Sequence, residues 1–167
     1  MIYLDHNATS PLRPEAKAAV LKALDMCGNP SSVHAAGRAA RALVEDAREQ
    51  VAAFAGAKAS EVIFTSGGTE ANTLALRGAV AAALETGERV IRLFVAATAH
   101  DSVRAVAASL PETAPGLKLT EVPVNENGRI EPEQFRSLLM NGKGRVLVSL
   151  LFANNETGVI EDIAGLA

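Results

Sequence analysis

The segment that most restricts the fold of this chain is residues 65–72, which read TSGGTEAN. It follows an apolar, β-branched run at residues 61–64 and precedes a run at residues 71–77 with helical character. A buried strand, a glycine turn and a helix in that order are typical of α/β proteins with a parallel sheet. The segment therefore predicts a turn between a sheet strand and a helix.

The same turn predicts a site for an anion. Gly67 and Gly68 have no Cβ, so a ligand can approach the main chain, and the first amide groups of a helix have no partner within it. These donors, the helix dipole and the Thr69 hydroxyl favour a phosphate. Because the phosphate-loop lysine and the Gly-x-Gly-x-x-Gly fingerprint are both absent, a single phosphate on a small cofactor fits better than a nucleotide. A glycine turn with a Ser or Thr cap and no ligand has the same pattern.

Predicted helices and strands alternate along the chain. Apolar residues at helical spacing predict helices at residues 14–27, 37–55, 70–84, 102–110 and 133–140. Strand-like runs occupy residues 62–64, 90–96, 117–122 and 145–152. With 167 residues, the chain is long enough for one domain. The alternation predicts the α/β class, with right-handed crossovers, a mainly parallel sheet and helices on both faces.

Polar residues follow three of the predicted strands. Beside the glycine turn, these are His100 in residues 98–101 and the amides Asn154 and Asn155 in residues 154–158. Open parallel sheets bind ligands at the carboxyl ends of their strands, so the three groups are expected at one edge. The imidazole can stack on an aromatic cofactor or move a proton, and the amides can bind a phenolic oxygen or a carboxylate. A solvated histidine before a helix and turn-forming asparagines remain alternatives.

Composition excludes several classes of partner and location. The formal net charge of −3 provides no cationic field, so neither nucleic acid nor an anionic membrane is an expected partner. A single cysteine excludes an internal disulfide, and the first residues lack the pattern of a signal peptide. No apolar run approaches the roughly 18 residues of a membrane span. The sequence predicts a soluble, cytoplasmic protein.

Four motifs together resemble the cysteine desulfurases, a branch of the class V aminotransferase family of fold type I pyridoxal phosphate enzymes. They are YLDHNATSP at residues 3–11, GNPSSVH at 28–34, FTSGGTEAN at 64–72 and NNETG at 154–158. The resemblance covers essentially the whole chain and implies a partial large domain of that fold. Residues 1–13 would lead into it, and residues 14–167 would form an incomplete pyridoxal phosphate-binding domain.

The resemblance also implies roles for four residues. Gly68 and Thr69 would hold the phosphate of pyridoxal 5'-phosphate, and His100 would stack on the pyridine ring as the catalytic residue of this portion. Asn155 would reach the ring oxygen and the substrate carboxylate. No metal site is implied.

The reaction implied by the resemblance converts L-cysteine to L-alanine and leaves a persulfide on a protein cysteine. The sulfur then passes to an acceptor protein, in iron–sulfur cluster assembly or thiolation, and family members are homodimers. The family pattern places the Schiff-base lysine, the aspartate at the pyridine nitrogen and the nucleophilic cysteine beyond Ala167, and Cys27 matches no nucleophile position. The chain alone is therefore predicted to be inactive, and a second polypeptide is expected to supply the C-terminal part.

Two positions depart from the family pattern: Ala99 stands where an acidic residue is usual, and Phe152 where many members have a histidine. The alternatives are a non-catalytic remnant or assembly module of the same fold, or another class V enzyme such as a selenocysteine lyase or an aminotransferase. A nucleotide-binding α/β domain is a weaker alternative.

Overall fold

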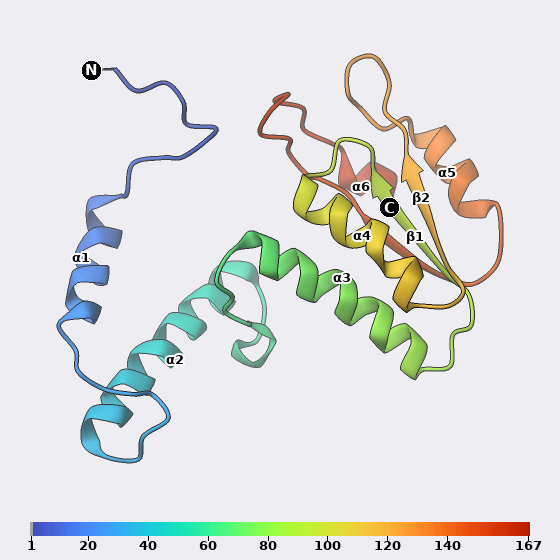
Figure 1. Cartoon of the computed structure of the whole chain (residues 1–167). Coiled ribbons are helices and arrows are strands. Elements are labelled where there is room, and N and C mark those ends of the chain that lie inside the picture. Colours follow the sequence, from blue (N-terminus) through green and yellow to red (C-terminus); the bar gives the residue numbers. More distant parts are fainter. Residues whose placement is uncertain (1) are drawn as a thin grey trace. The chain divides into compact units, whose positions relative to one another are not determined.

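The computed structural model describes residues 2–167, and contacts within the chain divide it into two compact units (Figure 1). The first unit ends at Phe64, and the second is Thr65–Ala167. No helix among the described residues has both the length and the apolar composition that crossing a membrane requires.

The first unit is helical. It contains α1 (Pro14–Leu24), α2 (Ala35–Ala55) and the short 3₁₀ helix η1 (Ala59–Glu61). Proline suits the start of α1 because the first helical amide needs no partner within the helix. His34 caps α2 by accepting a hydrogen bond from the Gly37 amide, and Gly56 ends it in the left-handed conformation with φ of 65°. Both long helices match the prediction.

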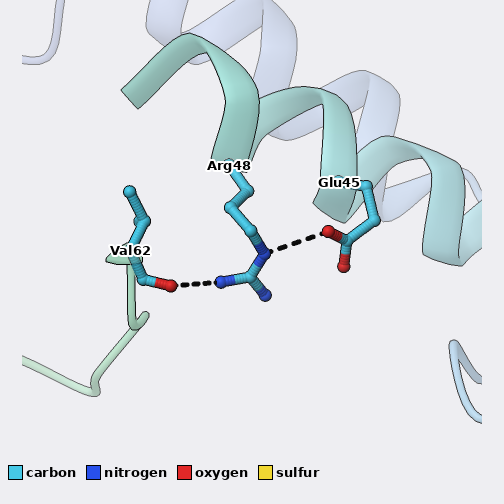
Figure 2. A network of polar contacts seen from close by, with 3 residues as sticks. All are labelled: Glu45, Arg48 and Val62. Atoms are coloured by element: carbon cyan, nitrogen blue, oxygen red, sulfur yellow. Dashed lines mark hydrogen bonds and ion pairs between the residues drawn. The ribbon is translucent and has the colours of Figure 1, made fainter. Parts of the chain in front are cut away.

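Arg48 joins α2 to the chain that follows η1 (Figure 2). Its Nε lies 3.0 Å from a Glu45 carboxylate oxygen, and its Nη1 donates to the main-chain oxygen of Val62 at 2.5 Å. The guanidinium also lies 5.0 Å from the centre of the Phe64 ring. One side chain thus fixes the segment that leads into the glycine turn.

The predicted strand at residues 62–64 is wrong. Val62 has an extended backbone, with φ of −91° and ψ of 124°, but no strand among the described residues pairs with this segment. Its carbonyl accepts a hydrogen bond from Arg48 instead, and Ile63 is 67% exposed. A strand requires a ladder partner as well as an apolar, β-branched sequence.

The second unit contains the sheet. Its elements are α3 (Gly68–Glu85), β1 (Ile91–Ala96), α4 (Asp101–Thr113), β2 (Leu117–Val122), α5 (Pro132–Met140), β3 (Arg145–Ser149) and α6 (Ile163–Leu166). All three strands are parallel, in the order β2-β1-β3. The third strand is shorter than predicted because Phe152 and its neighbours turn into a loop, in which Ala153 forms an antiparallel bridge with Ile160.

Helices cover both faces of the sheet. The chain crosses from β1 to β2 through α4 and then returns past β1 to β3 through α5, so right-handed connections require the two helices to lie on opposite faces. Helix α4 packs on β1 and β2, with α3 beside it (Figure 1). On the other face, the Phe94 ring of β1 meets the Phe135 ring of α5 edge to face, with centroids 6.5 Å apart. The predicted fold class is confirmed.

Glycines allow both outer strands to begin close to the chain that enters β1. Gly116 precedes β2 with φ of 88°, and a Cβ on it would lie 2.2 Å from the Arg89 carbonyl oxygen. Gly144 precedes β3 with φ of 117°, and a Cβ there would lie 2.5 Å from the carbonyl oxygen of Val90. A side chain at either position would push the outer strand away from the chain entering β1.

Candidate functional site

Helix α3 begins at the glycine turn without a capping side chain. Gly67 is its N-cap residue, and its backbone is extended, with φ of 173° and ψ of 178°. Nothing lies within 4 Å of the Cβ positions of Gly67 and Gly68, so the main chain is open to a ligand there. The first-turn amides and the Thr69 hydroxyl are therefore available donors at the positive end of the helix dipole.

Ser66 binds a neighbouring carboxylate instead of capping the helix. Its main-chain N–H and its hydroxyl both donate to one oxygen of Glu70, at 2.6 Å each. The hydroxyl and then the N–H of Ser66 lower the pKa of Glu70 below its ordinary value. The Ser cap considered as an alternative for this turn is thus absent.

Replacing Ser66 by alanine is expected to raise the pKa of Glu70 towards its ordinary value, because the larger of the two stabilising hydrogen bonds is lost. A carboxyl group whose pKa is lowered by folding adds stability above its unfolded pKa, and this contribution disappears as the pH falls through the folded pKa. A ¹³C NMR titration of the Glu70 carboxyl measures the change. Thr65→Val is the control, since the Thr65 hydroxyl donates to the Gly67 carbonyl oxygen. An equal shift in both variants would contradict the assignment.

A pocket of about 240 Å³ opens at the carboxyl ends of the neighbouring strands β1 and β3. The pocket is lined by His100 from the loop after β1 and by Arg104 from α4. The loop after β3 contributes Asn155 and Thr157. The structure therefore brings His100 and Asn155 together, at the edge where an open parallel sheet binds ligands. Gly68 and Thr69 do not line this pocket.

His100 is the N-cap residue of α4 as well as a pocket residue. Its Nδ1 accepts a hydrogen bond from the Ser102 main-chain N–H at 3.1 Å and lies 2.8 Å from the Ser102 hydroxyl oxygen. The ring is exposed, so its position is set by these local contacts. Asn residues before a helix often play this capping role, and the sequence pattern did not assign it to His100.

Asn154 ties the two pocket loops together. Its Nδ2 donates to the Thr98 carbonyl oxygen at 3.2 Å, while its Oδ1 accepts from the amides of Glu156 and Thr157 at 2.9 Å each. Asn154 therefore forms the turn considered as the alternative, and it also holds the β3 loop against the β1 loop. Asn155, the next residue, lies in the pocket wall.

One side-chain hydrogen bond links α3, which begins at the glycine turn, to α4, which follows His100. The Asn72 Nδ2 donates to the Ser102 hydroxyl oxygen at 2.9 Å, joining the second turn of α3 to the first turn of α4. Asn72 lies one helical turn after Thr69, and Ser102 lies two residues after His100. The turn and the pocket are thus near neighbours. Sequence reasoning missed both residues, although Asn72 belongs to the motif that it singled out.

The residues at this edge match the chemistry of pyridoxal phosphate. Open main-chain amides and a hydroxyl suit the phosphate, and an imidazole beside amides suits a flat ring that carries polar groups. The described residues contain no cluster of three or more His, Cys, Asp or Glu side chains that could hold a metal. The donor set favours an organic phosphate.

Known proteins match this chain along nearly its whole length. The family model described as aminotransferase class-V matches residues 2–167. A cysteine desulfurase IscS of Dictyoglomus turgidum is 40% identical over 167 residues, which cover 99% of this chain and 41% of that protein. A cysteine desulfurase of Cereibacter sphaeroides is 46% identical over 170 residues, which cover 99% of this chain and 42% of that protein.

A solved structure described as a NifS-like protein is similar in fold, with a TM-score of 0.85 and 30% sequence identity. The match covers 99% of this chain and 44% of that one. The chain thus spans about two-fifths of the length of the curated relatives that it matches.

Proposed function

Because the chain belongs to the class V aminotransferase family, we propose that its second unit binds the cofactor of a pyridoxal phosphate-dependent cysteine desulfurase. Bound pyridoxal phosphate supplies an electron sink for bonds at the substrate's α-carbon. The observation that carries the proposal is the pocket shared by His100 and Asn155, next to the open glycine turn of α3.

Each site residue has a role that its position supports. The amide groups of Gly68 and Thr69, together with the Thr69 hydroxyl, bind the phosphate at the start of α3. The His100 ring, which lines the pocket, would stack on the pyridine ring and could hold or move a proton at the substrate. The Asn155 amide orients the ring oxygen and the substrate carboxylate. Hydrogen bonds from Asn154 keep the two loops in register.

The proposed reaction transfers one sulfur atom. The C–S bond of L-cysteine breaks, its sulfur bonds to a protein thiol, and the products are L-alanine and a persulfide, so no external oxidant or reductant is needed. The persulfide sulfur then passes to an acceptor protein, as in iron–sulfur cluster assembly. The covalent lysine and the nucleophilic cysteine belong to the C-terminal part of the family fold, on the same or a second polypeptide, and the complete enzyme is a homodimer.

An apolar groove supports the need for this further part. It has a volume of about 530 Å³ and is lined on β3 by Val146 and Val148, and beyond it by Phe152. Val148 is 45% exposed and Phe152 is 67% exposed. Apolar surface of this kind is stabilised when further structure covers it. In the complete enzyme, the rest of the large domain covers this face.

A chimera tests the proposal. Residues 1–167 are joined to the remaining part of the Dictyoglomus turgidum cysteine desulfurase at the aligned position, and alanine release from L-cysteine is measured. Cysteine-dependent alanine with bound cofactor is the expected result. A folded chimera that binds cofactor but releases no alanine would favour another class V reaction. A folded chimera that binds no cofactor would favour a non-catalytic module.

Thr69→Val is expected to weaken pyridoxal phosphate binding to the chimera. The variant keeps the shape of the side chain but loses one hydrogen bond to a charged phosphate, a contact of about 1.5–3 kcal/mol. This corresponds to roughly 10- to 150-fold weaker binding by equilibrium dialysis. Thr73→Val is the control, because the Thr73 hydroxyl donates to the Thr69 main-chain oxygen at 2.8 Å, within the helix. Equal binding by both variants would refute the phosphate contact.

A further inference from the structure

We propose that Asn72 and Ser102 are positioning residues that fix the tautomer of His100, with Nδ1 as the acceptor and the proton of the neutral ring on Nε2. The three side chains form a continuous path from α3 to the pocket. Asn72 and Ser102 are half-buried, and His100 is exposed at its end. The use of the ring in catalysis rests on the proposed function, whereas its tautomer is a property of this chain.

The direction of each hydrogen bond follows from donor chemistry. A main-chain N–H can only donate, so the Ser102 amide, 3.1 Å away, requires a lone pair on Nδ1 of His100. The Asn72 Nδ2 also only donates, and it occupies a lone pair of the Ser102 hydroxyl oxygen at 2.9 Å. The hydroxyl hydrogen is then free to point to Nδ1, 2.8 Å away. Two donors thus meet at Nδ1.

A neutral imidazole carries one N–H, so a ring whose Nδ1 accepts must carry its proton on Nε2. The Nε2–H group is then the one that can donate to a ligand, and the ring plane is fixed by two contacts on the opposite side. The hydrogen bond made by one ring nitrogen of a histidine commonly decides which nitrogen carries the proton. Here that hydrogen bond comes from Ser102, whose hydroxyl is in turn held by Asn72. The same pair of side chains links α3 to α4.

His34 provides an internal comparison. It also caps a helix through Nδ1, which accepts from the Gly37 amide at 3.3 Å. The residue two positions after His34 is Ala36, which has no hydroxyl, whereas His100 is followed at that distance by Ser102. Capping alone therefore predicts the same tautomer for both histidines. Only the tautomer of His100 should also respond to a change in the Asn72 side chain.

The test is an NMR measurement on this chain labelled with ¹⁵N-histidine, which contains three histidines. Long-range ¹H–¹⁵N spectra at about pH 8.5, where ordinary histidines are neutral, report the tautomer of each ring. His100 is expected to be mainly the Nε2–H form. Mainly Nδ1–H at His100 in the unsubstituted chain would overturn the proposal, whatever the variants do.

Asn72→Asp is the decisive variant. Aspartate is nearly the same shape but only accepts, so it takes the Ser102 hydroxyl hydrogen and turns an oxygen lone pair towards Nδ1 of His100. The Nδ1–H fraction of His100 is expected to rise roughly five-fold, the ratio that one ordinary hydrogen bond supports. The His34 signals should stay unchanged because His34 lies in the first unit, and unchanged main-chain amide signals from β1 and β2 show that the second unit of the variant is folded.

Ser102→Ala removes the hydroxyl between the two groups, and Asn72→Asp in that background should no longer move the His100 tautomer. A shift that persists there, or no shift in the single variant, would overturn the proposal. A tautomer that does not respond, in a chain whose chimera still releases alanine, would refute this inference and leave the proposed function intact. A tautomer that responds, together with a chimera that releases no alanine, would support this inference and count against the proposed function.

Discussion

Replacing Arg92 by methionine is expected to lower the free energy of unfolding of the second unit by about 3 kcal/mol. Arg92 is the second residue of β1 and is only 8% exposed. Its guanidinium donates to the main-chain oxygens of Leu138 (2.6 Å) and Leu139 (2.9 Å) in the last turn of α5, and to that of Gly142 (3.2 Å) just after the helix. The last carbonyls of a helix have no partner within it, and methionine would leave these without one.

Arg145→Met on the adjacent strand β3 is the matched control. Arg145 forms an exposed ion pair with Glu88 at 3.9 Å, and such pairs contribute at most about 1 kcal/mol. Urea unfolding followed by circular dichroism measures both variants against the unsubstituted chain. A loss at Arg92 no larger than at Arg145 would show that water satisfies the α5 carbonyls.

The periodic parts of the chain were predictable because their pattern is local. Residues 117–122 were expected as a strand and form β2 with these bounds, and the apolar stripe of α2 predicted a long helix. Residues 62–64 have an equally strand-like composition, but their partner in a ladder is a property of tertiary structure. The burial of Arg92 within an apolar strand follows from the position of α5, which no local pattern encodes.

The same distinction applies to the candidate site. His100 and Asn155 could be named from the sequence because each follows a strand of a parallel sheet, and such ends meet at one edge. Asn72 and Ser102 are 30 residues apart in sequence and meet only because α3 packs on α4. Helical spacing does not predict which polar residues face each other across two helices.

Replacing His100 by alanine is expected to lower the turnover number of the chimera with L-cysteine by roughly 10²- to 10⁴-fold, the usual contribution of a positioned proton-transfer group. Pyridoxal phosphate binding should change much less, because the proposed phosphate site is at the start of α3. Alanine also removes the cap of α4, so lost activity alone would not separate chemistry from helix stability.

His100→Asn separates the two roles. Asparagine is among the best N-cap residues, and its side-chain oxygen can accept the Ser102 amide as Nδ1 does in the structure. It has no ring to stack on a pyridine, and it cannot exchange a proton near neutral pH. If the imidazole acts on the substrate, both variants lose turnover alike and only alanine loses stability. If His100 is solely a cap, asparagine restores turnover, and the catalytic role must then be assigned to another residue of the pocket.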